Sequence, residues 1–199
     1  MKETIVIASS NADKIREIEL ALDGLPYEFK AAREMGDFSE PKETGKTFAQ
    51  NAVIKASYYQ KLTGLSCLAD DSGLAVDALH GAPGVYSARF AGYHADDAVN
   101  NAKLVSELTK LGLTESAAHY TCVLALVLST GREILSCGEL HGTIRTVPVG
   151  DGGFGYDPYF YLPDGRTLAE VSRAEKNSFS HRGKALQELA EVLKYSQKN

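Results

Sequence analysis

The chain has 199 residues, of which 44% are hydrophobic and 24% are charged, and its formal net charge is −5 at pH 7. This length suits one domain with a sizeable core, so we expect a single domain over residues 1–199. The negative charge argues against a nucleic-acid or membrane-surface binder. No apolar run approaches the roughly 18 residues that a membrane helix needs.

The N-terminus and the cysteines indicate a protein of the reducing cytoplasm. The first residues contain one lysine before a short strand-like run, unlike a signal peptide. Cys67, Cys122 and Cys137 are odd in number, lie in strand-like segments and lack metal-ligand spacing. We therefore expect three reduced thiols that fill the core.

Strand and helix signals alternate along the chain. In chain order, the expected elements are strand 4–9, helix 13–22, helix 45–64, strand 65–70, helix 94–112, strand 119–130, strand 132–145, strand 157–163 and helix 182–195. Asp96 is the expected cap of helix 94–112. The turn at Thr130-Gly131 suggests that strands 119–130 and 132–145 form a hairpin. The predicted class is therefore α/β with a mixed sheet, because a hairpin adds antiparallel pairing to βα units.

The loop after the first strand combines hydroxyl and amide side chains with a lysine. Residues 9–14 read SSNADK and lie where a helix N-terminus offers free amides to an anion. The alternative is that Ser10, Asn11 or Asp13 only caps the helix. The glycine and lysine spacing of a P-loop is missing.

The segment 39–55 contains two acids and a polar stripe. Glu40 and Glu43 precede the helix and suit either a metal or the helix dipole. Thr47, Asn51 and Lys55 are four residues apart, so they share one face, which a solvated helix edge would also explain.

Two adjacent aspartates follow the apolar run of strand 65–70. We expect Asp70 and Asp71 to emerge at the end of that strand, where ligands of α/β proteins usually bind. Carboxylates at such a place suit Mg²⁺, whose charge offsets their repulsion. A surface turn is the alternative, since Asp, Ser and Gly favour turns.

Two segments in the last third of the chain suit a planar anionic ligand. Phe154 and Tyr156 lie among glycines in residues 150–160. Lys176, His181 and Arg182 precede the last helix, where positive charge opposes the helix dipole and suggests an external anion.

Taken together, these segments resemble the inosine/xanthosine triphosphate pyrophosphatases, or Ham1-like family. The matching motifs, in the order and spacing of the family, are S-x-N-x-x-K at 9–14, E-T-G-x-T-F-x-x-N-A-x-x-K-A at 43–56, A-D-D-S-G-L at 69–74, G-A-P-G-V-Y-S-A-R at 81–89, G-G-F-G-Y-D-P at 152–158 and E-K-N-x-x-S-H-R at 175–182. They span nearly the whole chain, so chance agreement has little room.

The resemblance implies an elongated mixed α/β domain with a twisted sheet, flanking helices and two lobes around a substrate cleft. It also implies Mg²⁺-dependent hydrolysis of the triphosphates of inosine, deoxyinosine and xanthosine to monophosphate and pyrophosphate, which cleanses the nucleotide pool. A homodimer is expected, and Tyr86, Phe90 and Tyr93 would suit its interface; the alternative is that these rings pack inside their own subunit.

The resemblance also implies residue roles. Asp71 is the expected proton acceptor and metal ligand, with Glu43 or Glu40 as the second metal acid. The expected substrate contacts are the phosphate loop Ser9, Ser10, Asn11, Ala12, Asp13 and Lys14, the phosphate-side Lys55, the neighbouring Ser72, the base-side Phe154, Gly155, Tyr156 and Asp157, and Lys176, His181 and Arg182. We expect Lys176 to meet phosphate, and His181 or Arg182 to donate to the 6-oxo group of the purine.

Two other functions remain open at this point. A Maf-type pyrophosphatase would act on modified pyrimidine nucleotides, although the segments 154–157 and 180–182 favour a purine. A purine-binding module without catalysis would not need both Asp70 and Asp71.

Overall fold

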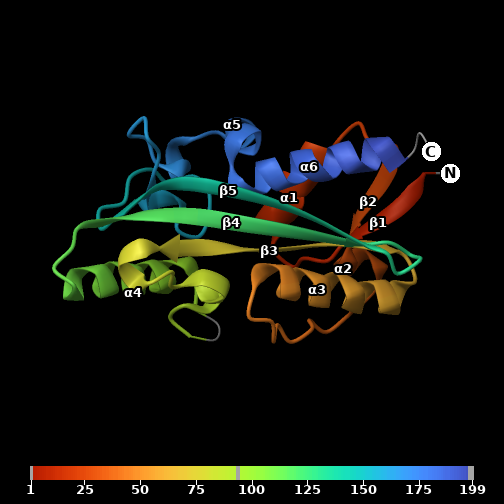
Figure 1. Ribbon diagram of the computed structural model, residues 1–199, viewed down its shortest axis with the longest axis horizontal. Coiled ribbons are helices and arrows are strands. Elements are labelled where there is room, and N and C mark those ends of the chain that lie inside the picture. Colours follow the sequence, from red (N-terminus) through yellow and green to blue (C-terminus); the bar gives the residue numbers. More distant parts are fainter. Residues whose placement is uncertain (1, 93–94, 197–199) are drawn as a thin grey trace. The chain divides into compact units, whose positions relative to one another are not determined.

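The computed structural model describes residues 2–92 and 95–196 and contains a six-stranded mixed sheet with helices beside it (Figure 1). The strands are β1 (Glu3–Ile7), β2 (Tyr27–Ala31), β3 (Ser66–Val76), β4 (Glu115–Val127), β5 (Glu133–Arg145) and β6 (Phe160–Tyr161). The helices are α1 (Ala12–Leu22), α2 (Ala32–Met35), α3 (Phe48–Thr63), α4 (Asp97–Lys110), α5 (Arg173–Phe179) and α6 (His181–Ser196).

The strand order is β2-β1-β3-β4-β5-β6. Strand β1 pairs in parallel with β2 and with β3, where Val6 lies opposite Cys67. Strands β5 and β6 pair antiparallel, with Ile144 opposite Phe160. The predicted α/β class with a mixed sheet is therefore confirmed.

The chain divides into two compact units, each with its own apolar core. Unit 1 comprises residues 1–71, 122–138 and 182–199, and unit 2 comprises residues 72–121 and 139–181. The core of unit 2 lies between α4 and the sheet and includes Leu74, Leu104 and Phe160.

In unit 1, alternate residues of the strands pack against different helices (Figure 1). Ile5, Ile7 and Leu68 belong to one cluster with α1 and α6. Val6 and Ala69 belong to a second cluster with α3. Because successive strand residues point to opposite faces, α1 and α6 cover one face of this part of the sheet and α3 covers the other.

Several boundaries differ from the prediction. Helix α3 begins at Phe48 rather than at residue 45, because the Thr47 hydroxyl accepts a hydrogen bond from the Gln50 amide at 3.2 Å and caps it. The last strand is shorter than expected, since residues 157–159 form a 3₁₀ turn. Strand β2 and helices α2 and α5 were not predicted. Asp96 does cap α4, as expected.

The prediction for strand 65–70 was wrong in a way that matters for function. Strand β3 continues through both aspartates to Val76, so they lie within a strand and not at its end. The prediction that all three cysteines fill the core is also wrong, because Cys137 is exposed while Cys67 and Cys122 are buried.

Candidate active site

Strand β3 carries Asp70 and Asp71 to opposite faces of the sheet in unit 1. Asp70 follows Leu68 at a spacing of two, on the face covered by α1 and α6. Asp71 follows Ala69 at the same spacing, on the face covered by α3. Each carboxylate therefore meets its own set of partners.

Asp70 is a saturated, ionised carboxylate. Its Oδ1 accepts a hydrogen bond from Lys14 Nζ at 2.5 Å, and its Oδ2 accepts from Arg182 Nε at 2.9 Å and from Cys122 Sγ at 3.2 Å. Burial opposes ionisation, but the charges of Arg182, Lys14 and Lys55 hold the pKa of Asp70 well below its ordinary value. A carboxylate in this state is a poor proton acceptor.

Asp71 has the opposite properties. Burial raises the pKa of Asp71 above its ordinary value, even though Lys55 acts to lower it. Its Oδ1 accepts a hydrogen bond from Lys55 Nζ at 2.9 Å, whereas Oδ2 is buried and has no hydrogen-bond partner among the described residues. This oxygen is thus available to an incoming group, and its carboxylate is the more basic of the two.

Glu43 joins Asp71 through Lys55. The Nζ atom of Lys55 lies 2.9 Å from Glu43 Oε1 and 2.9 Å from Asp71 Oδ1. Burial would lower the pKa of Lys55, but the charges of Asp71, Asp70 and Glu43 raise it, so the lysine stays charged. Glu40 is exposed and lies where its charge helps to raise the pKa of Tyr59, after the larger effect of burial. Of the two candidate acids, the structure brings Glu43 to Asp71.

These groups fit a magnesium ion better than a metal that needs a full protein cage. Among residues 2–92 and 95–196, no three His, Cys, Asp or Glu side chains converge as a metal site. Two carboxylates, one with an unpartnered oxygen, suit Mg²⁺, which keeps several waters and is usually held by one or two carboxylates together with substrate phosphates.

The loop 9–14 is shaped by a cap. The Asn11 side chain accepts hydrogen bonds from the amides of Asp13 at 2.9 Å and Lys14 at 3.2 Å, so Asn11 is the N-cap of α1. The Asn11 amide donates to Ser9 Oγ at 3.2 Å. The capping alternative therefore holds for Asn11. Ser10 and Ala12 are exposed, and Asp13 is half-buried.

Helix α3 fixes Lys55 through its polar stripe. Thr47 caps the helix, and the buried Asn51 accepts a hydrogen bond from the Gly45 amide at 2.8 Å. Lys55 follows one turn later and reaches the two carboxylates. In this stripe, Thr47 and Asn51 have structural roles, and Lys55 belongs to the candidate site.

In unit 2, an aromatic ring, a lysine and an aspartate form a compact group. Lys176 Nζ lies 2.7 Å from Asp157 Oδ2 and 4.6 Å from the centroid of the Phe154 ring, a cation–π geometry. The Phe154 amide donates to Asp157 Oδ2 at 3.0 Å. A side chain at Gly153 would place its Cβ 2.2 Å from the same oxygen, so only glycine fits there.

The position of Lys176 corrects the sequence-based expectation for this residue. Lys176 lies within α5 and not just before the last helix, and it is buried against the base-side residues Phe154 and Asp157. Its surroundings are therefore those of the residues expected on the base side. Tyr156 is also buried, and its hydroxyl donates to the Ser87 carbonyl at 2.7 Å, so it is a core residue.

His181 and Arg182 differ in their surroundings although they are neighbours in the chain. The His181 ring stacks on Tyr120, with centroids 4.7 Å apart and planes 10° apart. The Arg182 side chain is 1% exposed, and it pairs with Glu17 as well as with Asp70. The positive charge of Arg182 at the start of α6 is thus matched by internal carboxylates, not by an external anion.

Sequence reasoning missed three residues of these networks. Glu17 is 2% exposed and binds Arg182, Cys122 donates to Asp70, and Tyr120 stacks on His181. Glu17 follows Lys14 by three residues on α1, which was a weak signal that both face the sheet. Ser72, the expected substrate contact, is half-buried in β3.

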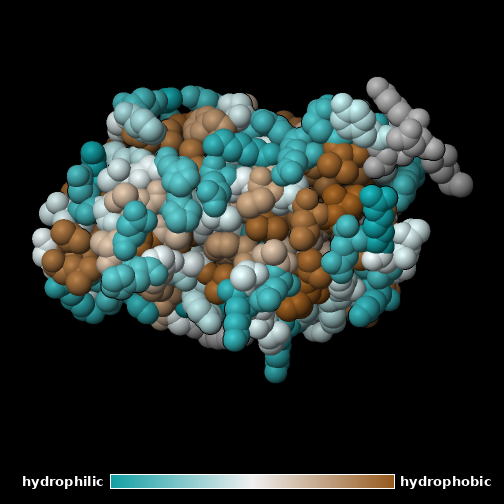
Figure 2. All heavy atoms as spheres, viewed as in Figure 1, coloured by the Kyte–Doolittle hydropathy of each residue, from teal (hydrophilic) through white to brown (hydrophobic). Residues whose placement is uncertain are grey.

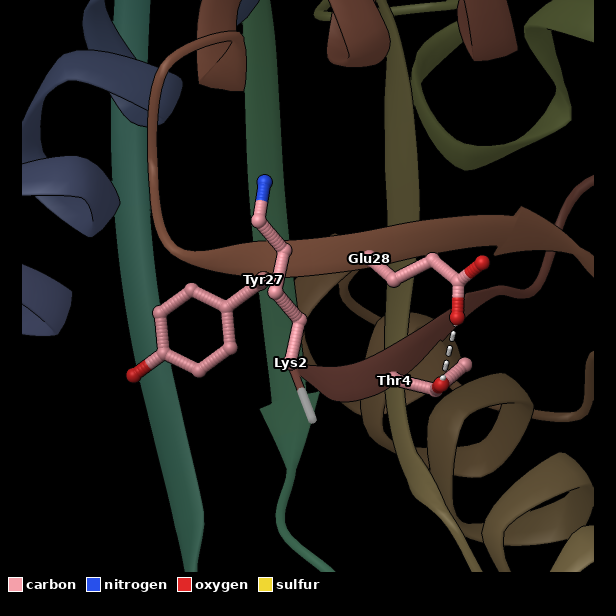
Figure 3. A pocket seen from close by; sticks show the side chains of 4 residues that line it. All are labelled: Lys2, Thr4, Tyr27 and Glu28. Atoms are coloured by element: carbon pink, nitrogen blue, oxygen red, sulfur yellow. Dashed lines mark hydrogen bonds between the residues drawn. The ribbon is translucent and has the colours of Figure 1, made fainter.

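A surface hollow elsewhere carries none of these groups. It has a volume of about 550 Å³ and is lined by four residues (Figure 3). Thr4 belongs to β1, Tyr27 and Glu28 belong to β2, and Lys2 precedes β1. Thr4 donates to Glu28 at 3.1 Å there. No predicted site residue lines this hollow, so we do not regard it as the active site.

The fold and the site define a class: a mixed α/β enzyme that presents a basic carboxylate beside lysines for phosphate chemistry. The family follows from comparison with known proteins. The model of the Ham1 family matches residues 5–192, and the chain belongs to this family.

Individual relatives agree with this assignment. A protein of Geobacter sulfurreducens named dITP/XTP pyrophosphatase is 50% identical over 190 residues, which cover 95% of this chain and 96% of that one. A protein of the same name from Shigella flexneri is 42% identical, over 96% of this chain and 98% of its own. The solved structure of a HAM1 protein from Coxiella burnetii matches with a TM-score of 0.88 at 42% identity, over 97% of this chain and 99% of that one.

Proposed function

We propose that this protein hydrolyses the triphosphates of deoxyinosine, inosine and xanthosine to the monophosphate and pyrophosphate. The observation that carries this proposal is the contrast between the two aspartates of β3: Asp70 is saturated, whereas Asp71 has a raised pKa and an unpartnered buried oxygen. Membership of the Ham1 family and the names of the relatives supply the reaction and the substrate class.

Asp71 is the general base of the proposed reaction. A water molecule at its Oδ2 gives up a proton to the carboxylate while the water oxygen forms a bond to the α-phosphorus. The bond between that phosphorus and the oxygen bridging to the β-phosphate breaks, and the electron pair leaves with pyrophosphate. Asp70 cannot take this role, because three donors already occupy it.

Lys14 and Lys55 are the proposed phosphate contacts. The ammonium group of Lys14 lies at Asp70 and that of Lys55 lies at Asp71, and both lysines are partly accessible. Their charge offsets the repulsion between a triphosphate and the carboxylates, and it holds the phosphates in one orientation for attack. The exposed Ser10 and Ala12 leave the turn before α1 open to the same phosphates.

We propose Mg²⁺ as the metal, held by Asp71 and Glu43. Such an ion supplies positive charge that offsets the charge of the phosphoryl oxygens and of the leaving pyrophosphate. Glu40 is not included, since Glu43 and not Glu40 shares Lys55 with Asp71.

Unit 2 supplies the groups that suit a purine. Phe154 offers an aromatic face for stacking, and Lys176 and His181 are polar groups of the same unit that lie against aromatic rings. A donor placed at the 6-position accepts hypoxanthine and xanthine, which carry a carbonyl there, and rejects the amino group of adenine. We propose Lys176 and His181 for this role in place of Arg182, whose guanidinium binds two carboxylates.

The alternatives are less well supported. The match to the Ham1 family over residues 5–192 disfavours a Maf-type enzyme for pyrimidine nucleotides. The raised pKa of Asp71 disfavours a binding module without catalysis, which needs no base.

We further propose a homodimer of single-domain chains in the cytoplasm. Tyr86 is 60% exposed. On the face shown in Figure 2, hydrophobic patches reach the surface between hydrophilic residues. Phe90 is half-buried under Lys103 and packs on its own core, and Tyr93 lies outside the described residues. Every helix of the described part of the chain is too short or too polar to cross a bilayer.

A substrate panel tests the proposed reaction. Purified protein is incubated with Mg²⁺ and with dITP, XTP, ATP, GTP or a modified pyrimidine triphosphate, and pyrophosphate and phosphate are measured separately. We expect pyrophosphate from dITP and XTP far above the other nucleotides, and a turnover at least about 100-fold lower in Asp71→Asn. Release of phosphate alone, or preference for the pyrimidine, would overturn the proposal.

A further inference from the structure

One residue of the loop that carries Phe154 is held through both its backbone amide and its backbone carbonyl by a single helix. The amide of Gly155 donates to Asp97 Oδ2 at 2.6 Å, and the carbonyl of Gly155 accepts from Asn101 Nδ2 at 2.9 Å. Asp97 and Asn101 are four residues apart on α4, so they lie on one face of the helix. All of these residues belong to unit 2.

Gly155, the residue held in this way, adjoins the proposed stacking residue. Gly155 has φ +63°, a left-handed conformation that glycine adopts without strain, and it directly follows Phe154. On its other side, the Phe154 amide is tied to Asp157, which pairs with Lys176. The backbone that carries the Phe154 ring is therefore fixed from two directions, by α4 and by the Asp157–Lys176 pair.

The contacts of Asn101 indicate that it holds the loop in place and adds little to the stability of the core. Its side chain is buried, with the residue 7% exposed, and its Oδ1 has no hydrogen-bond partner among the described residues. An apolar residue would avoid this unsatisfied acceptor, but it would release the Gly155 carbonyl. The hydrogen bond of the Asn101 side chain to Gly155 thus serves the loop and not the core.

We propose that Asp97 and Asn101 are positioning residues that set the Phe154 ring against the purine. The inference rests on the proposed function, because it requires that Phe154 stack on the base. Neither residue touches the substrate; each acts through Gly155. The competing explanation is that the two contacts only attach the loop to α4.

The test compares variants that remove one contact with variants that keep it. Asp97→Ala and Asn101→Leu each lose a hydrogen bond to Gly155, whereas Asp97→Asn keeps an oxygen acceptor. Asp96→Ala is the matched control, because the Asp96 side chain accepts a hydrogen bond from the Val99 amide and caps α4. It weakens the same helix without touching Gly155.

Steady-state kinetics on dITP and inhibition by inorganic tripolyphosphate separate the two explanations. We expect Asp97→Ala and Asn101→Leu to raise KM for dITP about tenfold, the scale of one lost base–aromatic stack. Tripolyphosphate, which has no base, should inhibit them as it inhibits the wild type. Asp97→Asn should recover most of the loss, and Asp96→Ala should keep the wild-type KM. Equal weakening of dITP and tripolyphosphate would overturn the inference.

A double-mutant cycle with Phe154→Ala tests the route of action. If α4 acts through the ring, Asn101→Leu has little further effect on KM once the ring is gone. The same tenfold effect in the Phe154→Ala background would refute positioning through Phe154.

Calorimetric binding of inosine monophosphate to the same variants does not need catalysis. If inosine monophosphate binds more weakly to Asp97→Ala and Asn101→Leu, and the wild-type protein does not hydrolyse dITP, the proposed reaction is rejected and this inference stands. Binding that is equal in all variants would reject the inference alone.

Discussion

Replacing each aspartate of β3 by asparagine should separate stability from catalysis. Asp70→Asn removes the charge that Arg182 and Lys14 contact, and it leaves buried cations that are less well compensated. Breaking a buried pair from one side costs about 3–5 kcal/mol, and we take about 3 because Arg182 keeps Glu17. For a chain of this size that is a fall in Tm of about 6–12 °C.

Asp71→Asn should leave the Tm close to that of the wild type. Burial raises the pKa of Asp71, so its ionised form is disfavoured in the folded state and an uncharged amide relieves that cost. Lys55 loses one partner but keeps Glu43 at 2.9 Å. We expect a change within about 1 kcal/mol in the free energy of unfolding. Turnover should nevertheless fall by at least about 100-fold, because the proton acceptor is lost.

Thermal unfolding followed by circular dichroism, together with pyrophosphate release from dITP, checks both variants. The pH dependence of the Tm tests whether the ionised form of Asp70 stabilises the fold. The pKa of Asp70 is lowered in the folded state, so the stability that it contributes is present above its ordinary pKa and is lost on acidification. The gap in Tm between wild type and Asp70→Asn should therefore narrow as the pH falls. Equal losses of Tm in the two variants, or an active Asp71→Asn protein, would refute the reasoning.

Further predictions address the remaining groups. Lys14→Ala should weaken binding of a triphosphate more than binding of inosine, as measured by calorimetry, and equal losses would remove this lysine from the phosphates. Arg182→Ala should lower the Tm but keep the ratio of kcat/KM for inosine triphosphate over ATP, whereas Lys176→Met should narrow that ratio; the reverse pattern in steady-state kinetics would restore Arg182 as the reader of the base. Tyr86→Glu should shift a dimer toward a 21.5 kDa species in sedimentation, and an unchanged dimer would place the interface elsewhere.

The sequence predicted the class of fold and most of the elements because apolar periodicity marks buried strands and helices well. It failed at the aspartates of β3, since Asp-Asp-Ser-Gly has the composition of a turn. A strand can contain these acids only because Lys14, Arg182 and Lys55 approach from three helices, and those approaches are set by tertiary structure. No local pattern contains that information.

The same reason explains why the internal partners of the basic residues were not predicted. From the sequence, Arg182 and Lys176 were expected to contact an external anion, because a sequence shows which residues are charged but not which of them form ion pairs. Their partners Glu17 and Asp157 lie 165 and 19 residues away along the chain. Segments recognised by resemblance were nevertheless brought together within each unit, as Glu43, Lys55 and Asp71 show in unit 1.

The alternation of β3 limits how this segment can vary in length. Pairing of β3 with β1 fixes Leu68 opposite Ile7. Inserting or deleting one residue between Leu68 and the aspartates would exchange the faces of the sheet to which the Asp70 and Asp71 side chains point. The acid that now meets α1 and α6 would then face α3, and the other would face Arg182. Substitutions in β3 can thus be tolerated one side chain at a time, but a single-residue change in length would disable both carboxylates together. Residues 36–42, between α2 and the motif at 43–56, are not bound to a ladder in this way. Among related chains we therefore expect length differences there and a constant spacing from Leu68 to Asp71.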